Sequence, residues 1–421
     1  MYSDRICRYL VLKGYFLFLL IIPILSVPGF TSAQNVEITL DQIRELSEQH
    51  SPQWQQFENR QDYQVSGERA SAARLNPAIA YNLEFLDDGR QSDYEHDIYL
   101  QKEFRTPGHF RNLRNRRDSR IRLIEHETEQ NRAEWLATTR FGFIRIVLIQ
   151  QELKMVEQLK EHLDRLISAS ARRAEEGEVS PLDNRLIEMS SYQLHARINE
   201  QNINLERLIT AWRNRMGFDE DTELLFTGNF EEPDFTFPEI EDLLTILIES
   251  PQAKANRQSV EAAGFEEALE QARRFPSFEL SAGYKHLTPH WQGFLVGVAI
   301  PLPLLNQNTD AIAQARVLEQ IERINMESAQ KEQSQLMLQL LQAIRTYEEK
   351  LTQFPGHLHQ PEQFLNSLTI SYEEGTYSLT DFLNTLGLMA DSYETKFNQL
   401  ENYYAFATEI EAITGQLFIS Q

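Results

Sequence analysis

The chain has 421 residues and a formal net charge of −23, because 63 Asp and Glu side chains outnumber 40 Lys and Arg side chains. This acidic balance argues against a nucleic-acid partner, since phosphate binding needs basic stripes. The single cysteine, Cys7, lies in the N-terminal leader. The chain beyond it has no thiol, which excludes disulfides, cysteine metal sites and a cysteine nucleophile.

The first 33 residues have the pattern of a secretory signal peptide. Three basic residues precede an apolar run at residues 15–25, and Thr31-Ser32-Ala33 gives a small-x-small cleavage pattern. The apolar run is too short to cross a bilayer as a helix. We therefore predict an exported protein with a signal peptide at residues 1–33 and a mature chain that begins near Gln34.

The mature sequence repeats its landmarks at an offset of about 198 residues. Four landmarks recurring in register indicate a gene duplication and two units that pack about a pseudo-symmetry axis. We predict a first helix-hairpin-helix repeat at residues 34–230 and a second at residues 231–421, intertwined in one domain. Three of the matched pairs are Ser51-Pro52-Gln53 with Ser250-Pro251-Gln252, Ala73-Arg74 with Ala272-Arg273, and Glu175-Glu176-Gly177 with Glu373-Glu374-Gly375.

Each repeat contains two segments of alternating apolar and polar residues, which predicts a β-hairpin. The segments cover residues 78–85 and 94–101 in the first repeat and 277–284 and 293–300 in the second. Strands of about ten residues have the length that a tilted membrane-spanning strand needs. An ordinary half-buried hairpin also alternates.

The polar faces of these strands carry Glu84, Asp97 and Glu279, which a water-filled lumen would solvate. Four strands alone cannot close a barrel, so this interpretation requires an oligomer. Near the strand ends, aromatic residues are candidates for an interfacial girdle. They are Tyr81, Tyr94, Tyr284 and Trp291.

A long amphipathic helix follows each hairpin. Residues 109–174 contain no proline and one glycine, and apolar residues from Ile149 to Leu166 keep coiled-coil spacing. A helix of that length spans about 100 Å. Val317, Ile321 and Ile324 continue the pattern in the second repeat. Returning helices are expected at residues 181–216 and 379–413, joined to the long helices by glycine-containing turns far from the hairpins.

The two turns have the same capping chemistry. Glycine suits a helix C-terminus, serine suits the next N-cap, and aspartate in the first turn suits the helix dipole. Capping alone is enough to account for them. The residues are Gly177, Ser180 and Asp183 in the first repeat and Gly375, Ser378 and Asp381 in the second.

With these features, the chain resembles the TolC-type outer-membrane efflux factors over essentially the whole mature sequence. Members of that family place an aromatic residue, a glycine three positions on and an aspartate six beyond it, which here are Tyr372, Gly375 and Asp381. In the first repeat Ala174 replaces the aromatic residue. The string from Glu103 to Arg111 also looks like the Pro-Gly-basic junction of the heavy-metal (CzcC-like) branch.

The resemblance implies an α+β fold that is mainly α, with long antiparallel coiled-coil helices and two β-hairpins per protomer. It implies a homotrimer whose twelve strands form one outer-membrane β-barrel, continuous with an α-helical periplasmic tunnel. The tunnel would dock to a periplasmic adaptor (membrane fusion protein) and an inner-membrane pump of the resistance-nodulation-division type.

The resemblance also makes the tip a closable gate and an adaptor-docking surface. Tyr372 and Asp381 would bond across helices, and Asp183 would contribute from the first repeat. Tyr377 and Asn384 stand where some members have an arginine and an aspartate. A salt-linked latch is therefore not expected.

The sequence offers little enzyme or metal chemistry. His357 and His359 supply two imidazoles between Pro355 and Pro361, but a closed metal site needs about four ligands, and a helix break is the simpler interpretation. No phosphate-binding Gly-rich loop, His-Glu-x-x-His helix or Gly-x-Ser-x-Gly elbow occurs. We predict no enzymatic activity and no cofactor.

Together these features predict a passive exit duct in the outer membrane of a Gram-negative-type bacterium, extending into the periplasm. Heavy-metal cations are the favoured cargo because of the branch resemblance and the acidic balance. One alternative is the same channel exporting drugs, other organic solutes or peptides. Another is a soluble periplasmic coiled-coil scaffold in which the hairpins form a small sheet domain.

Overall fold

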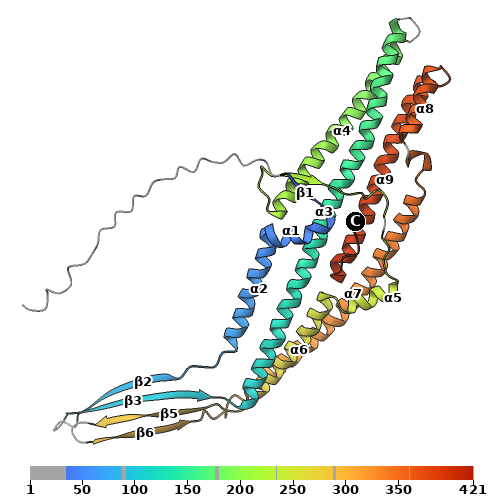
Figure 1. The fold of residues 1–421 in the computed structure, drawn as a ribbon. Helices are drawn as coiled ribbons and strands as arrows, with labels where there is room; N and C mark the ends of the chain where they lie inside the picture. The colour runs from blue at the N-terminus through green and yellow to red at the C-terminus, as the bar shows by residue number, and fades with distance from the viewer. Residues whose placement is uncertain are drawn as a thin grey trace, which may run out of the picture.

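The structure is a computed structural model, and it describes residues 35–87, 92–175, 180–233, 235–287, 291–359 and 361–420. The predicted signal peptide and the first hairpin turn around Gly89 lie outside these ranges. The protein is elongated: long helices run side by side, the β-sheet lies at one end and the tip turns lie at the other (Figure 1).

The elements recur in the same order in the two halves of the chain. The first half contains β1 (Asn35–Ile38), η1 (Leu40–Gln42), α1 (Ile43–His50), α2 (Pro52–Ser71), β2 (Ala78–Asp87), β3 (Ser92–Phe104), α3 (Pro107–Glu175) and α4 (Pro181–Met216). The second contains β4 (Glu223–Phe226), α5 (Ile240–Ile248), α6 (Pro251–Ala272), β5 (Phe278–Leu287), β6 (Trp291–Ala299), α7 (Thr309–Thr352), η2 (Gly356–His359), α8 (Pro361–Glu373) and α9 (Leu379–Thr414).

The two predicted hairpins form and join into one antiparallel sheet of order β2-β3-β5-β6. Within each hairpin the strands pair as expected, and β3 then pairs with β5 from Glu95–Leu287 to Phe104–Phe278. The pairing between hairpins was not predicted. A second sheet, with β1 parallel to β4, lies near the middle of the long helices.

The helix α3 is the central element of the bundle. Its 69 residues span roughly 100 Å and pack against α6 near the sheet and against α4 and α9 further along. Part of the buried core lies around the small sheet, where Phe143 packs against Phe226 and Phe230, with ring centroids 5.7 and 6.2 Å away. Full burial of such a side chain contributes about 1.5–3 kcal/mol.

Each returning helix ends against the second α-helix of its own half. Gly217, with φ +80°, caps α4, and a Cβ atom there would lie 2.7 Å from Cδ of Pro52. Gly415, with φ +72°, caps α9, and a Cβ there would lie 3.0 Å from Cδ of Pro251. Glycine adopts this left-handed conformation without steric cost. These glycines form a further matched landmark that sequence comparison of the halves missed.

The halves differ in the helix that descends from the sheet. Whereas α3 is continuous, its counterpart is divided into α7, the 3₁₀ turn η2 and α8, which confirms the predicted break between Pro355 and Pro361. The predicted apolar seam on α7 is also divided. Met337 and Ile344 are buried, whereas Val317, Ile321 and Ile324 are exposed in the protomer.

The fold class is thus mainly helical with a small β component, as predicted. In the part of the chain that the structure describes, none of the helices combines the length and apolar character needed to cross a membrane.

Candidate functional site

The predicted tip residues cap helices within the protomer. Ser180 Oγ accepts a hydrogen bond from the Leu182 backbone N–H at 3.2 Å, and the Asp183 carboxylate accepts one from the Ser180 N–H at 3.4 Å. At the second tip, Ser378 Oγ accepts from the Asp381 N–H at 3.1 Å and donates to the Asp381 carboxylate at 2.6 Å. Both pairs satisfy N–H groups that a helix N-terminus leaves free.

The turn at the second tip requires its glycine. Gly375 has φ +74°, and its N–H donates to the carbonyl oxygen of Tyr372 at 3.0 Å. The side chain of Tyr372 is only 5% exposed, and its ring packs against Phe382 at 5.9 Å. The Tyr377 hydroxyl lies 3.0 Å from that of Thr385. Within one protomer Tyr372 therefore has a packing role, and its predicted bond across helices stays a prediction.

Two tip residues, Asp381 and Asn384, are exposed at the surface. They lie on the first turns of α9, where they are accessible to another molecule. Gly177 lies outside the described residues.

The sheet has a polar face that carries all three predicted carboxylates. By register, Glu84 pairs with Glu95, Asp97 pairs with Lys285, and Glu279 pairs with Glu103. Side chains two residues apart on a strand point to the same face, so these six residues share one face. The Lys285 ammonium forms an ion pair with Glu95 and lies 3.9 Å from Asp97. Lys285 was not predicted as a member of the polar face. Its place there could have been read from the sequence, because it follows Tyr284 of the apolar face in an alternating strand.

The opposite face of the sheet is apolar and exposed. Phe294 is 93% exposed and Val296 79% exposed, and Ile79 on β2 is exposed as well. Of the proposed girdle residues, Tyr81, Tyr94 and Tyr284 belong to this face by register. Trp291 does not, because it pairs with Leu287 and so lies on the face of Glu95. The expectation of a four-membered girdle is corrected to three.

A pair of histidines lies on the apolar face. His96 and His286 are cross-strand partners with ring centroids 6.3 Å apart, and the Tyr81 hydroxyl lies 2.8 Å from Nδ1 of His96. The side chains of His357 and His359 are not among those described. Across the described ranges, no three His, Cys, Asp or Glu residues gather in a way that would hold a metal ion.

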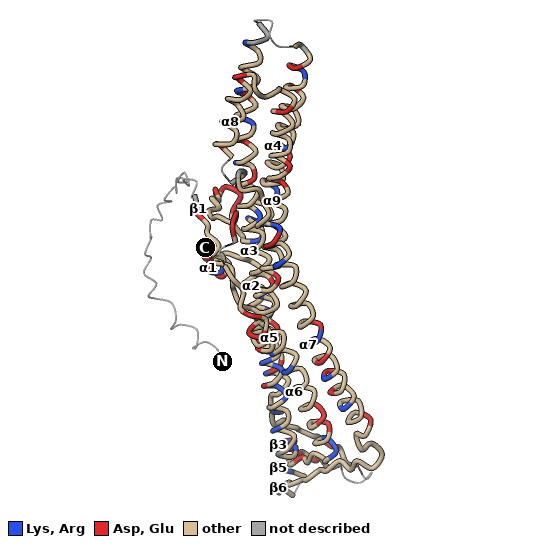
Figure 2. Tube along the Cα trace, turned by 90° about the vertical axis from the view of Figure 1, so that its right-hand side faces the viewer, with Lys and Arg blue, Asp and Glu red and all other residues tan. Residues whose placement is uncertain are grey.

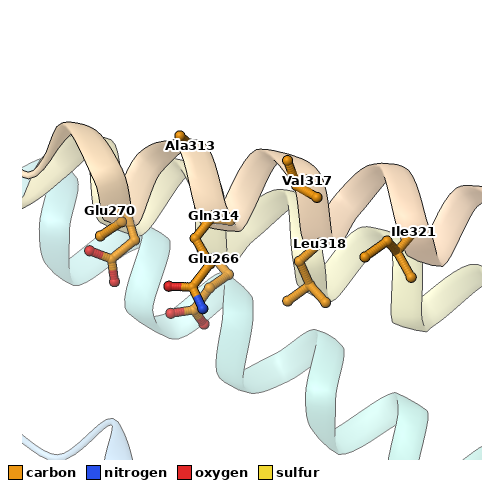
Figure 3. Close-up of a pocket in the computed structure, with 9 residues that line it drawn as sticks. Glu266, Glu270, Ala313, Gln314, Val317, Leu318 and Ile321 are labelled. Atoms are coloured by element: carbon orange, nitrogen blue, oxygen red, sulfur yellow. The ribbon is translucent and has the colours of Figure 1, made fainter.

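A groove of about 640 Å³ runs between α6 and α7 close to the sheet. Figure 3 shows Val317, Leu318 and Ile321 along α7 above Glu266 on α6. The apolar side chains are the exposed part of the α7 seam. Because coiled-coil seams normally meet a partner helix, this strip is an uncovered packing surface.

No family model matches the chain. The cobalt-zinc-cadmium resistance protein CzcC of Cupriavidus metallidurans is 25% identical over 294 residues, which cover 65% of this chain and 66% of that protein, just under two thirds of each. The solved structure of CusC matches with a TM-score of 0.72 at 12% identity, covering 89% of this chain and 90% of CusC.

The CmeC outer membrane channel of Campylobacter jejuni matches with a TM-score of 0.70 at 13% identity, covering 91% of this chain and 87% of CmeC. The fold is therefore shared over nearly the whole length, and the CzcC match adds a relationship in sequence. The chain is thus similar in fold to outer-membrane channels and similar in sequence to CzcC, which agrees with the resemblance to the TolC-type outer-membrane efflux factors.

A polar network fixes the corner between β3 and α3. Arg105 Nε donates to the Glu103 carboxylate at 3.2 Å, and its Nη1 donates to Nε2 of His109 at 3.1 Å. Burial, Arg105 and Arg273 together lower the pKa of His109, so the ring stays neutral and accepts this bond. The Pro-Gly-basic string noted in the sequence is thus a strand-to-helix joint.

Side chains of α9 hold the break between α7 and α8 in place. The Tyr393 hydroxyl donates to the carbonyl oxygen of Leu358 in η2 at 3.2 Å. The buried Lys396 ammonium lies 3.1 Å from the Glu231 carboxylate and 5.3 Å from the Phe354 ring centroid. Burial and the Glu231 carboxylate raise the pKa of Tyr393, so its hydroxyl stays a donor.

Proposed function

We propose that this chain is the channel subunit of a tripartite efflux system and provides its passive exit duct through the outer membrane. The observation that carries the proposal is the sheet: four strands of membrane-spanning length with one polar face and one exposed apolar face. An exposed apolar face of this extent is unfavourable in water and favourable in lipid. The same face argues against the soluble scaffold.

The proposed assembly is a homotrimer. The sheet has two open edges, β2 and β6, whose unpaired backbone groups need partners in lipid. Three copies joined edge to edge give a closed barrel of twelve strands, with Glu84, Asp97 and Glu279 facing its lumen. The exposed Val317, Leu318 and Ile321 strip on α7 supports contact with a second copy. The helices would then continue the duct into the periplasm.

The proposed partners bind at the tip, far from the sheet. A periplasmic adaptor and an inner-membrane pump, of the resistance-nodulation-division type, would engage the turns at Ser180 and Ser378. Asn384 and Asp381 are exposed there and available for contacts between copies or with the adaptor. Tyr372, Gly375 and Tyr377 would shape the gate, since they fix the turn that precedes α9.

The proposed cargo is heavy-metal cations. The support is the match to CzcC, whose name describes cobalt-zinc-cadmium resistance, together with carboxylates on the polar face of the sheet. The test is growth of a deletion strain on graded zinc, cobalt, cadmium and copper, beside a panel of dyes and antibiotics. Lost metal tolerance supports this cargo. Unchanged metal tolerance with lost dye tolerance would replace it with organic solutes.

Fractionation tests the channel itself. We expect a heat-modifiable trimer in detergent extracts of the outer membrane. Recovery of the whole protein as a soluble periplasmic monomer would refute the proposal and support the alternative of a soluble coiled-coil scaffold.

A further inference from the structure

Cationic side chains surround the base of the sheet, where the strands meet the helices. Arg74 follows α2, Lys102 lies near the end of β3, and Arg111 and Arg114 lie in the first turns of α3. We name these four residues the basal belt. Figure 2 shows basic residues gathered in this region of a chain whose net charge is −23.

The belt differs from the arginines that follow it on α3. Arg116, Arg120 and Arg122 each form an ion pair, with Glu266, Glu68 and Glu261 respectively. Arg74, Arg111 and Arg114 are exposed, and none of them pairs with a carboxylate among the residues that the structure describes. Their charges are free to meet an external anion.

Aromatic side chains lie next to two members of the belt. The Lys102 ammonium lies 5.8 Å from the centroid of the Phe104 ring, which stacks on Phe278 at 5.4 Å. The Arg74 guanidinium lies 5.5 Å from the centroid of the Phe110 ring. By register Lys102 lies on the apolar face beside Leu280, and the Phe104–Phe278 pair follows it at the helix end of the sheet. At this end the apolar strand residues give way to cationic and aromatic side chains, which are the residue types found at the boundary of a bilayer.

An apolar loop joins β6 to α7 at the same end of the sheet. Between β6 and α7, Leu302, Leu304 and Leu305 are 72%, 78% and 102% exposed. The loop is fixed at its end by Asn308, whose side-chain amide donates to the carbonyl oxygen of Glu270 at 2.8 Å. Apolar side chains held at this level would enter the acyl boundary of a leaflet while the basal belt reaches its phosphates.

We infer that the basal belt binds the phosphate groups of anionic phospholipids in the leaflet nearest the helices. Charge complementarity selects this occupant, since unpaired arginines and a lysine favour anionic over zwitterionic headgroups. The inference rests on the proposed function, because it needs the sheet to lie in a membrane. It goes further by assigning a lipid class and the residues that select it.

The test is native mass spectrometry of the full-length assembly in detergent, titrated with phosphatidylglycerol or with phosphatidylcholine of the same acyl chains. The wild type should retain phosphatidylglycerol preferentially. In the variant Arg74→Gln/Arg111→Gln/Arg114→Gln, the preference for phosphatidylglycerol over phosphatidylcholine should fall at least about tenfold. Each cation near the membrane surface contributes about fivefold to the affinity for an anionic lipid. Raising the salt concentration should weaken the preference in the wild type.

The control variant is Arg44→Gln/Arg185→Gln/Arg323→Gln, which removes three exposed arginines away from the sheet. It should keep the wild-type preference. Equal retention of both lipids by the wild type, or equal loss in both variants, would overturn the inference. Displacement of the lipid by inorganic phosphate at equal concentration would also overturn it, since the site would then be a plain anion site. Failure to insert into vesicles would instead refute the proposed function.

Discussion

Arg140 and Glu411 form an ion pair that water hardly reaches: their side chains are 2% and 0% exposed, and Nε lies 3.0 Å from Oε2. Arg140 also donates to the backbone carbonyls of Leu40 and Ile419. Glu411 accepts from the backbone N–H groups of Phe418 and Ile419 at 2.7 and 2.9 Å. One buried network thus joins α3, α9 and the segment after α9.

Removal of one partner from this pair should be strongly destabilising. Arg140→Ala leaves a buried carboxylate without its cation, which costs about 3–5 kcal/mol. Thermal unfolding of the purified protein should show a transition lowered by several degrees. The exposed Arg44→Ala is the matched control and should change the stability by less than about 0.5 kcal/mol. Equal, small effects in both variants would show that the network carries little stability.

The two capping glycines should respond unequally to alanine. A Cβ atom at Gly217 would lie 2.6 Å from the carbonyl oxygen of His50. A Cβ atom at Gly415 would have its closest neighbour, Cδ of Pro251, at 3.0 Å. Both positions have positive φ, which alone costs alanine about 1 kcal/mol. We expect Gly217→Ala to lower the unfolding temperature more than Gly415→Ala.

Gly67 on α2 serves as the control for this comparison. A Cβ there meets nothing within 4 Å, so Gly67→Ala should be neutral or stabilising by up to about 1 kcal/mol. A Gly217→Ala protein as stable as Gly67→Ala would contradict the tight joint between α4 and α2.

Several elements were predictable because their signals are local. Pro181 and Gly217 bound α4, and the predicted range of residues 181–216 agrees with the helix because proline suits its first turn and glycine its end. Alternation likewise identified the four strands. The predicted range of β3 was too short at both ends: pairing with β2 extends the strand back to Ser92, and pairing with β5 extends it forward to Phe104.

Relationships between distant segments were not predictable. Arg140 and Glu411 are 271 residues apart in the sequence, and no local pattern joins them. The strands β1 and β4 have four residues each, too few for alternation to show. At the tip, the glycines and serines were recognisable as caps, but the packing of Tyr372 on Phe382 depends on how α8 meets α9.

Glu152 should make the stability depend on pH. Burial raises its pKa above the usual value of 4.5, and Arg197 and the side-chain bond from Gln201 oppose the shift only in part. The folded state therefore favours the protonated form, and this contribution to stability is present below the unfolded-state pKa and lost as pH rises through the raised, folded-state pKa.

Glu152→Gln should remove the loss of stability that the wild type shows as pH rises. The variant should unfold at a higher temperature than the wild type near pH 8 and at a similar temperature near pH 4, because glutamine keeps the bond to Gln201 without the buried charge. Glu157→Gln, at an exposed position on the same helix, is the control and should follow the wild type at both pH values. A pH profile of Glu152→Gln that coincides with the wild type would disprove the assignment.

The proposed gate can be tested without disturbing the packing of the tip. Tyr372→Phe keeps the ring against Phe382, and Asp381→Asn keeps an oxygen that can accept from Ser378. If these groups close the duct by bonding across helices, the double variant should raise single-channel conductance in planar bilayers. Tyr63→Phe, at an exposed position on α2 far from the tip, is the control and should leave conductance close to the wild type. Unchanged conductance in the double variant would place closure elsewhere.

The most direct test of the central claim compares the two faces of the sheet in a membrane. The chain beyond Cys7 has no cysteine, so Ser281→Cys on the polar face and Val296→Cys on the apolar face each introduce a single thiol. With the protein reconstituted in vesicles, a charged water-soluble maleimide should label Ser281→Cys and leave Val296→Cys unlabelled. Equal labelling of both thiols would show that the apolar face lies in water and would contradict the account.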